Sequence, residues 1–217
     1  MWVGFPASGR APGRGRYERG DSNATRFRAQ RARLLGATAI AHLEREPSVT
    51  RVTTLSGVGR NTFYECFDDF QHALRGVRLE AVRRVRRAIG VWAEGSAGVD
   101  RASELCRLWL QAIAEEPLSA LVALEPQSGD MEPEVITPFR EALMQLMPPG
   151  VACDDARLMH AGACAGSSAR DVALGVLGTA PNSLLSAVTG PGPSNTVPAT
   201  VIESLDRSVK SLLADKL

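Results

Sequence analysis

The sequence has 217 residues, of which 44% are hydrophobic and 23% are charged, an ordinary globular composition that excludes wholesale disorder. The length allows one large domain or two small ones. The net charge of +1 conceals a division. Residues 1–90 carry 17 arginines, no lysine and 8 acidic residues, a formal charge of +9, whereas residues 91–217 carry 8 basic and 16 acidic residues, a formal charge of −8. This segregation indicates that the first part meets a polyanion and that the second part has another task.

Cysteine spacing and hydropathy indicate in which cellular compartment the protein works. Cys66, Cys106, Cys153 and Cys164 form neither a C-x-x-C pair nor a cysteine and histidine set at zinc spacing, which disfavours disulfides and metal binding. Apolar runs are all shorter than the roughly 18 residues of a membrane span, and the N-terminus lacks the pattern of a signal peptide. We therefore expect a soluble cytoplasmic protein that needs no metal or cofactor and has no membrane partner.

The first 24 residues combine glycine, proline and arginine without apolar periodicity, which predicts a flexible basic arm. Such an arm can add phosphate attraction, or it can be a leader without a role. Helical periodicity begins at Arg26, with a single apolar stripe from which Arg31 and Arg33 lie mostly away. The helix is expected to end by Glu46 because Pro47 disfavours helix in the residue before it. Ser48 is a predicted N-cap for a short helix over 49–56.

A turn of Gly57, Val58 and Gly59 follows this short helix. Glycine takes positive φ without penalty, and a valine between two glycines can plug the core between helices. The next helix is predicted over 60–67 with Phe63 and Phe67 facing inward, four residues apart. Its opposite surface carries side chains that can bond phosphates or base edges, namely Arg60, Asn61, Thr62 and Tyr64.

A longer helix is predicted from a cap at Asp68 or Asp69 to about residue 94, and it looks like a connector between domains. Beyond it, arginine becomes rare, and amphipathic stretches predict helices near 100–116, 117–125, 133–147, 154–176, 181–189 and 198–215. Period-2 alternation of useful length is missing from the sequence. The expected fold is all-α, with a DNA-binding domain over 25–75 and a second helical domain over 95–217.

The string GVGRNTFYECF, from Gly57 to Phe67, closely resembles the turn and recognition helix of the TetR family of transcriptional regulators, which typically read G-V-S-x-x-T-F-Y-x-x-F. Residues 34–43 and 69–74 resemble that family's first helix and the start of its fourth. The resemblance implies an N-terminal three-helix domain with a helix-turn-helix that binds DNA. It also implies a larger helical domain that binds an effector and dimerises.

Carried over to this chain, the resemblance makes Arg60, Asn61 and Thr62 candidates for contacts to base edges or nearby phosphates. Tyr64 would contact the DNA backbone through its hydroxyl. Ser48 matches a position where the family often places a hydroxyl beside a phosphate, at a helix N-terminus that favours an anion. Arg51, on the outer face of the second helix, is a further phosphate candidate.

Three departures from the family pattern bear on DNA affinity. The linker of Glu46, Pro47 and Ser48 is shorter than usual, and Gly59 replaces the usual Ser or Thr cap. Asp68 and Asp69 stand where a lysine commonly meets the DNA backbone, and two carboxylates repel phosphates. We therefore expect the phosphate contacts to move toward Ser48, Arg51 and the basic N-terminal segment.

The second domain is expected to hold a small apolar effector, because ligand pockets are largely apolar with a few polar groups. Candidate lining residues are Trp109, Met131, Phe139, Met144, Met147 and His160. Ordinary core packing explains each of them equally well. The small-sided stretch over 161–169 suits either a dimer interface with the last helix or a crossing within the chain, and the sequence leaves both open.

The sequence as a whole predicts a homodimeric TetR-like repressor that binds a palindromic operator and is released by the effector. A two-fold protein reads half-sites about 34 Å apart, or a multiple of this distance. Catalysis is not expected, because the three histidines lie far apart and no catalytic motif is present. The alternatives are a helical protein with a non-DNA role, either an enzyme or a protein-interaction module, an RNA-binding or nucleoid protein, and a DNA-binding protein that is ligand-independent or redox-responsive through Cys66.

Overall fold

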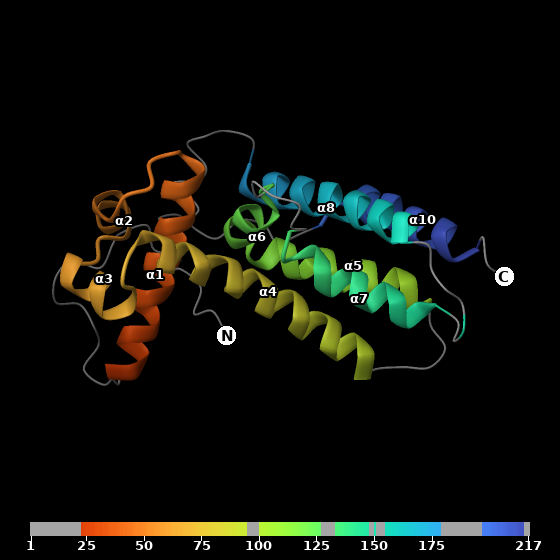
Figure 1. Ribbon diagram of the computed structural model, residues 1–217, viewed down its shortest axis with the longest axis horizontal. Coiled ribbons are helices and arrows are strands. Elements are labelled where there is room, and N and C mark those ends of the chain that lie inside the picture. The colour runs from red at the N-terminus through yellow and green to blue at the C-terminus, as the bar shows by residue number, and fades with distance from the viewer. Residues whose placement is uncertain are drawn as a thin grey trace. The chain divides into compact units, whose positions relative to one another are not determined.

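The computed structural model describes residues 23–94, 100–126, 133–147, 150, 155–178 and 197–214. Every regular element in these ranges is an α-helix (Figure 1), so the all-α prediction is confirmed at this level. The chain divides into two compact units: Met1–Val77 with Leu177–Ser194, and Arg78–Val176 with Asn195–Leu217. We call them the first and second unit. The helix predicted over 181–189 lies outside the described residues, as does the expected basic arm apart from its last two residues, which are helical.

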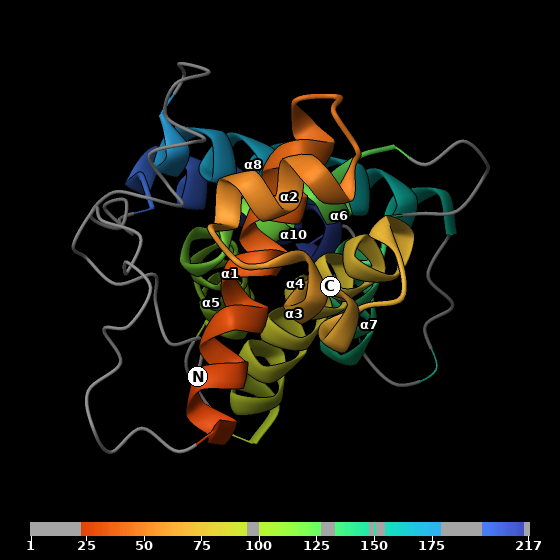
Figure 2. The ribbon, with the colours of Figure 1, turned by 90° about the vertical axis from the view of Figure 1, so that its left-hand side faces the viewer.

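The first unit contains α1 (Asn23–Leu43), α2 (Val49–Ser56), α3 (Arg60–Cys66) and the start of α4 (Phe70–Glu94). Helices α1, α2 and α3 contact one another, and Figure 2 looks onto all three. The sequence predicts a single apolar stripe on α1, but all eight residues over 34–41 are buried. Four of the eight are alanine or glycine, whose small size lets neighbouring helices approach α1 on several sides. The Thr38 hydroxyl donates to the Leu34 carbonyl at 2.8 Å, which satisfies it inside the core.

The turn between α2 and α3 needs only one of its two glycines for its backbone. Gly57 has φ 62° and ψ 19°, the left-handed conformation that favours glycine. Gly59 has φ −65° and ψ 153°, which any residue can adopt, and it gives α3 no side-chain cap. Val58 between them is 5% exposed, so its predicted place in the core is confirmed.

Polar caps fix where α2 and α4 begin. The Ser48 hydroxyl accepts from the amide of Arg51 at 3.1 Å, which confirms the predicted N-cap of α2. The Asp69 carboxylate accepts from the amide of His72 at 2.7 Å at the start of α4. Capping by a short polar side chain stabilises a helix by about 1 kcal/mol, so these two residues anchor the helices on either side of α3.

The second unit is arranged around α5 (Arg101–Glu115), which contacts α6 (Pro117–Leu124), α7 (Ile136–Leu146) and α10 (Ala199–Ala214). Every residue of α6 is buried. An ion pair joins α10 to the residue that caps α5: Lys210 pairs with Asp100. Within α10, Lys210 Nζ also lies 3.0 Å from Asp206 Oδ2. Among the residues that the structure describes, no helix is both long and apolar enough to cross a membrane.

The small residues of α8 (Asp155–Leu177) are used within the chain. A Cβ atom built on Gly166 would lie 2.6 Å from the Cδ1 atom of Ile136, and one on Gly162 would lie 3.1 Å from the Cδ atom of Arg140. Both neighbours belong to α7. At these two glycines, the crossing within the chain is therefore the one observed.

Candidate nucleic-acid interface

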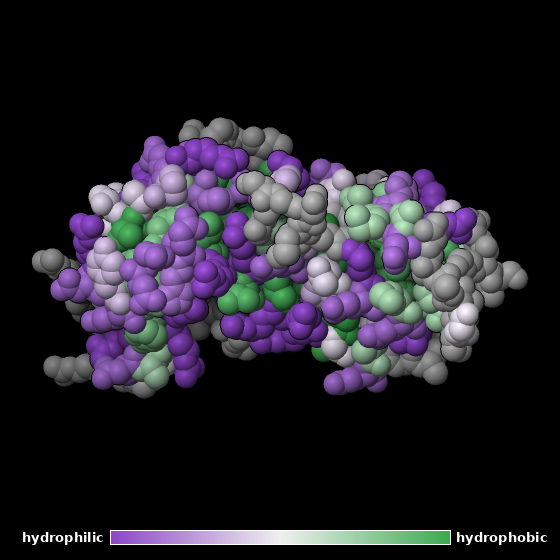
Figure 3. Space-filling view, viewed as in Figure 1, coloured by the Kyte–Doolittle hydropathy of each residue, from purple (hydrophilic) through white to green (hydrophobic). Residues whose placement is uncertain are grey.

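Helix α3 separates its apolar and polar side chains onto opposite faces. Phe63 and Phe67 are 0% and 1% exposed, with ring centroids 5.7 Å apart. Among the polar residues of the other face, Arg60, Asn61 and Tyr64 are exposed. Hydrophilic residues predominate over the surface of α2 and α3, at the left of the space-filling view (Figure 3). The predicted inward and outward faces of α3 are both present.

The outward side chains of α3 are not used to hold the fold. Within the described ranges, no hydrogen bond or ion pair engages the side chains of Arg60, Asn61 or Thr62. Thr62 is half-buried. The Tyr64 ring, 49% exposed, meets the Phe63 ring edge to face at 5.5 Å and 89°. This packing steadies the phenol and leaves its hydroxyl without a protein partner among the described residues.

Ser48 keeps hydrogen-bonding capacity beyond its cap. It is exposed, and its oxygen accepts from the Arg51 amide. A hydroxyl has one donor proton in addition to its acceptor lone pairs, so Ser48 can donate to an anion while it caps α2. The first amides of α2 lie beside it, and the positive end of the helix dipole favours such an anion.

Arg51 has a different place from the one predicted. Its Nη2 atom lies 2.7 Å from Glu44 Oε2, and its Nε atom lies 3.1 Å from Glu46 Oε2. The hydrogen bond that Arg51 donates to Glu44 is the main cause of the raised pKa of Arg51. Two carboxylates balance this guanidinium, so it offers no free positive charge to a phosphate. It instead joins α2 to the end of α1 and the linker after it.

Arg31 and Arg33, both on α1, also contact other parts of the first unit. Arg33 donates to the carbonyl of Ser56 at the end of α2, and the Arg31 guanidinium lies over the Phe67 ring, 5.1 Å from its centroid. The sequence places both away from the apolar stripe and gives no sign of these contacts. Part of the positive charge of residues 1–90 therefore stabilises the fold of the first unit.

The carboxylates at the start of α4 also have partners in the protein. Asp69 caps the helix, and Asp68 Oδ2 lies 3.0 Å from His72 Nδ1. The amide of Asp68 also lies 3.2 Å from His72 Nδ1. Both carboxylates are thus engaged in the local structure at the start of α4.

Cys66, on α3, is half-buried, and burial raises the pKa of its thiol. The thiolate is the reactive form of cysteine, and sensor cysteines have a lowered pKa. The raised pKa argues against the redox-responsive alternative.

The five predicted effector residues that the structure describes differ in burial. Trp109 and Phe139 are fully buried and their ring centroids lie 4.6 Å apart. Met144 is 58% exposed and His160 is exposed on α8. Met147 is half-buried, and Met131 lies outside the described residues. Within the described part of this set, the structure shows a ring contact between the two aromatic residues.

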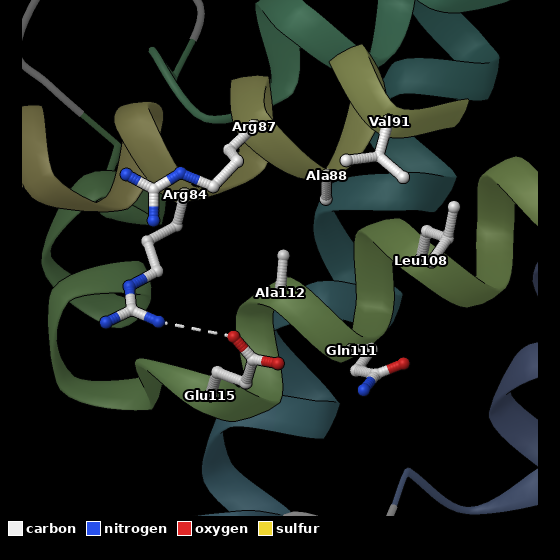
Figure 4. A pocket seen from close by; sticks show the side chains of 8 residues that line it. All are labelled: Arg84, Arg87, Ala88, Val91, Leu108, Gln111, Ala112 and Glu115. Carbon is white, nitrogen blue, oxygen red and sulfur yellow. Dashed lines mark hydrogen bonds and ion pairs between the residues drawn. The ribbon is translucent and has the colours of Figure 1, made fainter. Parts of the chain in front are cut away.

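Sequence reasoning missed a pocket in the second unit. It has a volume of about 220 Å³ and lies between α4 and α5 (Figure 4). Its lining residues are Arg84, Arg87, Ala88, Val91, Leu108, Gln111, Ala112 and Glu115. They recur at intervals of three and four residues on each helix, which is also the spacing of any helix face. No sequence signal reports which two faces meet.

Ion pairs of Arg84 flank this pocket on the side of α6. Arg84 Nη1 lies 3.2 Å from Glu115 Oε2, and Arg84 Nη2 lies 2.9 Å from Glu116 Oε1. Glu116 is 9% exposed. Burial raises the pKa of Glu116 to about 8, and the charge of Arg84 opposes that rise.

The chain as a whole matches no known protein family, no curated protein and no solved structure.

Proposed function

We propose that this protein is a DNA-binding transcriptional regulator of the TetR kind, in which α2 and α3 form the helix-turn-helix. Helix α3 enters the major groove, where Arg60 and Asn61 contact base edges. Tyr64 and Ser48 hold the DNA backbone, with Thr62 at the rim of the contact. Arg51 acts indirectly, by fixing α2 against α1.

One observation carries the proposal: α3 presents polar groups that have no hydrogen-bond or ion-pair partner among the described residues. The inward face of α3 already holds the helix through Phe63 and Phe67, so the outward groups are available to a partner. The outward set combines guanidinium, amide and hydroxyl groups. These are the groups that read base edges and bond phosphates.

The protein would act as a homodimeric repressor on a palindromic operator, because a two-fold protein presents two recognition helices to two equal half-sites. A small effector in the second unit would favour a dimer whose recognition helices no longer match the half-site spacing. The remaining exposed side chains of α8, together with α10, are available for the dimer contact.

The experiment measures binding of the full chain to the DNA upstream of its own gene, by fluorescence anisotropy, with Arg60→Ala and Tyr64→Phe variants. Arg60→Ala is expected to weaken the operator by about tenfold or more and to relax its specificity, because a bidentate base contact is worth about 1–3 kcal/mol. Tyr64→Phe is expected to weaken all duplexes alike.

Arg86→Ala is the matched control, since it removes the same charge from an exposed position on α4, outside the proposed DNA and dimer contacts. It should bind as the wild-type protein does. If Arg60→Ala also binds as wild type does, α3 is not the recognition helix.

A further inference from the structure

The pocket between α4 and α5 owes its space to two alanines. Ala88 of α4 and Ala112 of α5 point toward each other in its middle (Figure 4). Larger side chains stand at both ends, so the two helices are held apart there and the alanines leave a hollow between them. The hollow lies within the second unit alone.

The two ends of this pocket differ in chemistry. Val91 and Leu108 form an apolar end, and the opposite end carries Arg84, Arg87 and Glu115 (Figure 4). Such a gradient suits a ligand with one apolar part and one charged part.

At the charged end, one arginine is left without a partner among the described residues. Arg84 is committed to Glu115 and Glu116. Arg87 is exposed, and within the described ranges it has no hydrogen bond or ion pair. An anion next to Arg87 would gain a charge-assisted hydrogen bond, and a carboxylate matches the planar guanidinium in shape.

The volume limits the size of the ligand. A cavity of 150 Å³ holds benzene, so a volume of about 220 Å³ corresponds by proportion to about nine non-hydrogen atoms. A ring or short chain carrying one carboxylate has this size.

We propose that this pocket binds a small organic carboxylate, with the carboxylate at Arg87 and the hydrocarbon part between Ala88, Ala112, Val91 and Leu108. The proposal that a carboxylate binds here depends only on the lining of the pocket. The role of this carboxylate as the effector rests on the proposed function, because only a DNA-binding protein has an operator to release.

The test is calorimetric titration of the full chain, without DNA, using benzoate and its neutral isostere benzamide. Benzoate is expected to bind one site per chain with a Kd on the order of 0.1–1 mM. Benzamide is expected to bind about tenfold more weakly, because it lacks the charge that meets Arg87. Equal binding of the two probes, or no heat from benzoate, would overturn the proposal.

Two variants locate the site. Arg87→Gln should weaken benzoate about tenfold and leave benzamide unchanged, whereas Arg86→Gln, an equal loss of charge at an exposed residue outside the pocket, should change neither. Ala112→Leu fills the hollow and should abolish both, with circular dichroism as the check on its fold. An Arg87→Gln protein that binds benzoate normally contradicts the assignment, whatever the Ala112 variant does.

Failures of the two proposals are distinguishable. A protein that binds its operator but not benzoate overturns the pocket assignment and leaves the DNA-binding function standing. A protein that binds benzoate at Arg87 but has no operator overturns the proposed function and leaves the pocket assignment standing.

Discussion

The two units use their charged and polar side chains in different ways. On α3 of the first unit, Arg60 and Asn61 stand exposed, without a partner among the described residues. In the second unit, Arg84 binds two carboxylates and Lys210 binds two more. The polar set on α3 is therefore free for a partner. In the second unit, Arg87 at the pocket is likewise without a partner among the described residues.

The largest expected effect tests whether each unit has its own core. Phe67→Ala and Phe139→Ala each remove a ring that is at most 1% exposed, so each should lower the free energy of unfolding by about 3–5 kcal/mol. Hydrogen exchange should show lost protection in α1–α3 for the first variant and in α5–α7 for the second. Equal loss in all helices for both variants would mean a single cooperative unit.

Glu116 contrasts with the exposed polar residues of α3 because its charge is buried. Its folded-state pKa, raised to about 8 from a usual 4.5, means that the folded chain holds a proton that the unfolded chain has lost. The resulting stability is complete below pH 4.5 and is lost as the pH rises to about 8, by roughly 1.4 kcal/mol per unit of raised pKa.

Chemical denaturation at a series of pH values should therefore show that Glu116→Gln gains stability relative to wild type as the pH rises from 5 to 8. Glu203→Gln, at an exposed position on α10, is the control and should follow the wild-type profile. Parallel profiles for wild type and Glu116→Gln would show that burial does not perturb this carboxyl.

A pair of glycine variants on α8 tests the crossing with α7. Gly166→Leu should lower the free energy of unfolding by about 1–3 kcal/mol through overpacking, because even a Cβ atom meets Ile136 at 2.6 Å. Gly175→Ala, where no atom lies within 4 Å of an added Cβ, should raise it by about 0.5 kcal/mol. Thermal unfolding of the two variants measures both. If the two substitutions change the free energy of unfolding in the same direction, the crossing of α7 and α8 is contradicted.

The smallest effects distinguish the two turn glycines of the first unit. Gly57→Ala should destabilise by about 1 kcal/mol, because its φ of 62° is left-handed. Gly59→Ser should stabilise by about 0.5 kcal/mol, since its backbone is ordinary, its surroundings are open and a serine would cap α3. Denaturant midpoints of these two variants give the comparison. A Gly57→Ala protein as stable as wild type would contradict the turn geometry.

The helices of the first unit could be predicted because local rules define them. The cap at Ser48, the glycine turn and the spacing of Phe63 and Phe67 are all short-range signals, and each is present in the structure. The partners of Arg51 were not predictable in the same way. They depend on how the chain turns after α1, where Arg45 has φ 62° and brings Glu44 and Glu46 to the same guanidinium.

The second unit was predictable in its helices but not in its site. Apolar periodicity located α5 and α7, yet the same periodicity fits a core residue and a pocket residue equally well. The sequence indicates Trp109 and Phe139 as candidate pocket residues, and the structure packs both in the core. The pocket that exists depends on which helix faces meet, and this is a property of tertiary packing.

The central claim is that the exposed face of α3 reads DNA sequence, and one measurement tests it most directly. The affinity of the wild-type chain for the duplex upstream of its own gene is compared with that for a shuffled duplex of the same composition, over a salt titration. The account predicts at least about a thousandfold preference for the upstream duplex, retained as salt weakens both complexes. Equal affinity for the two duplexes at every salt concentration would contradict it.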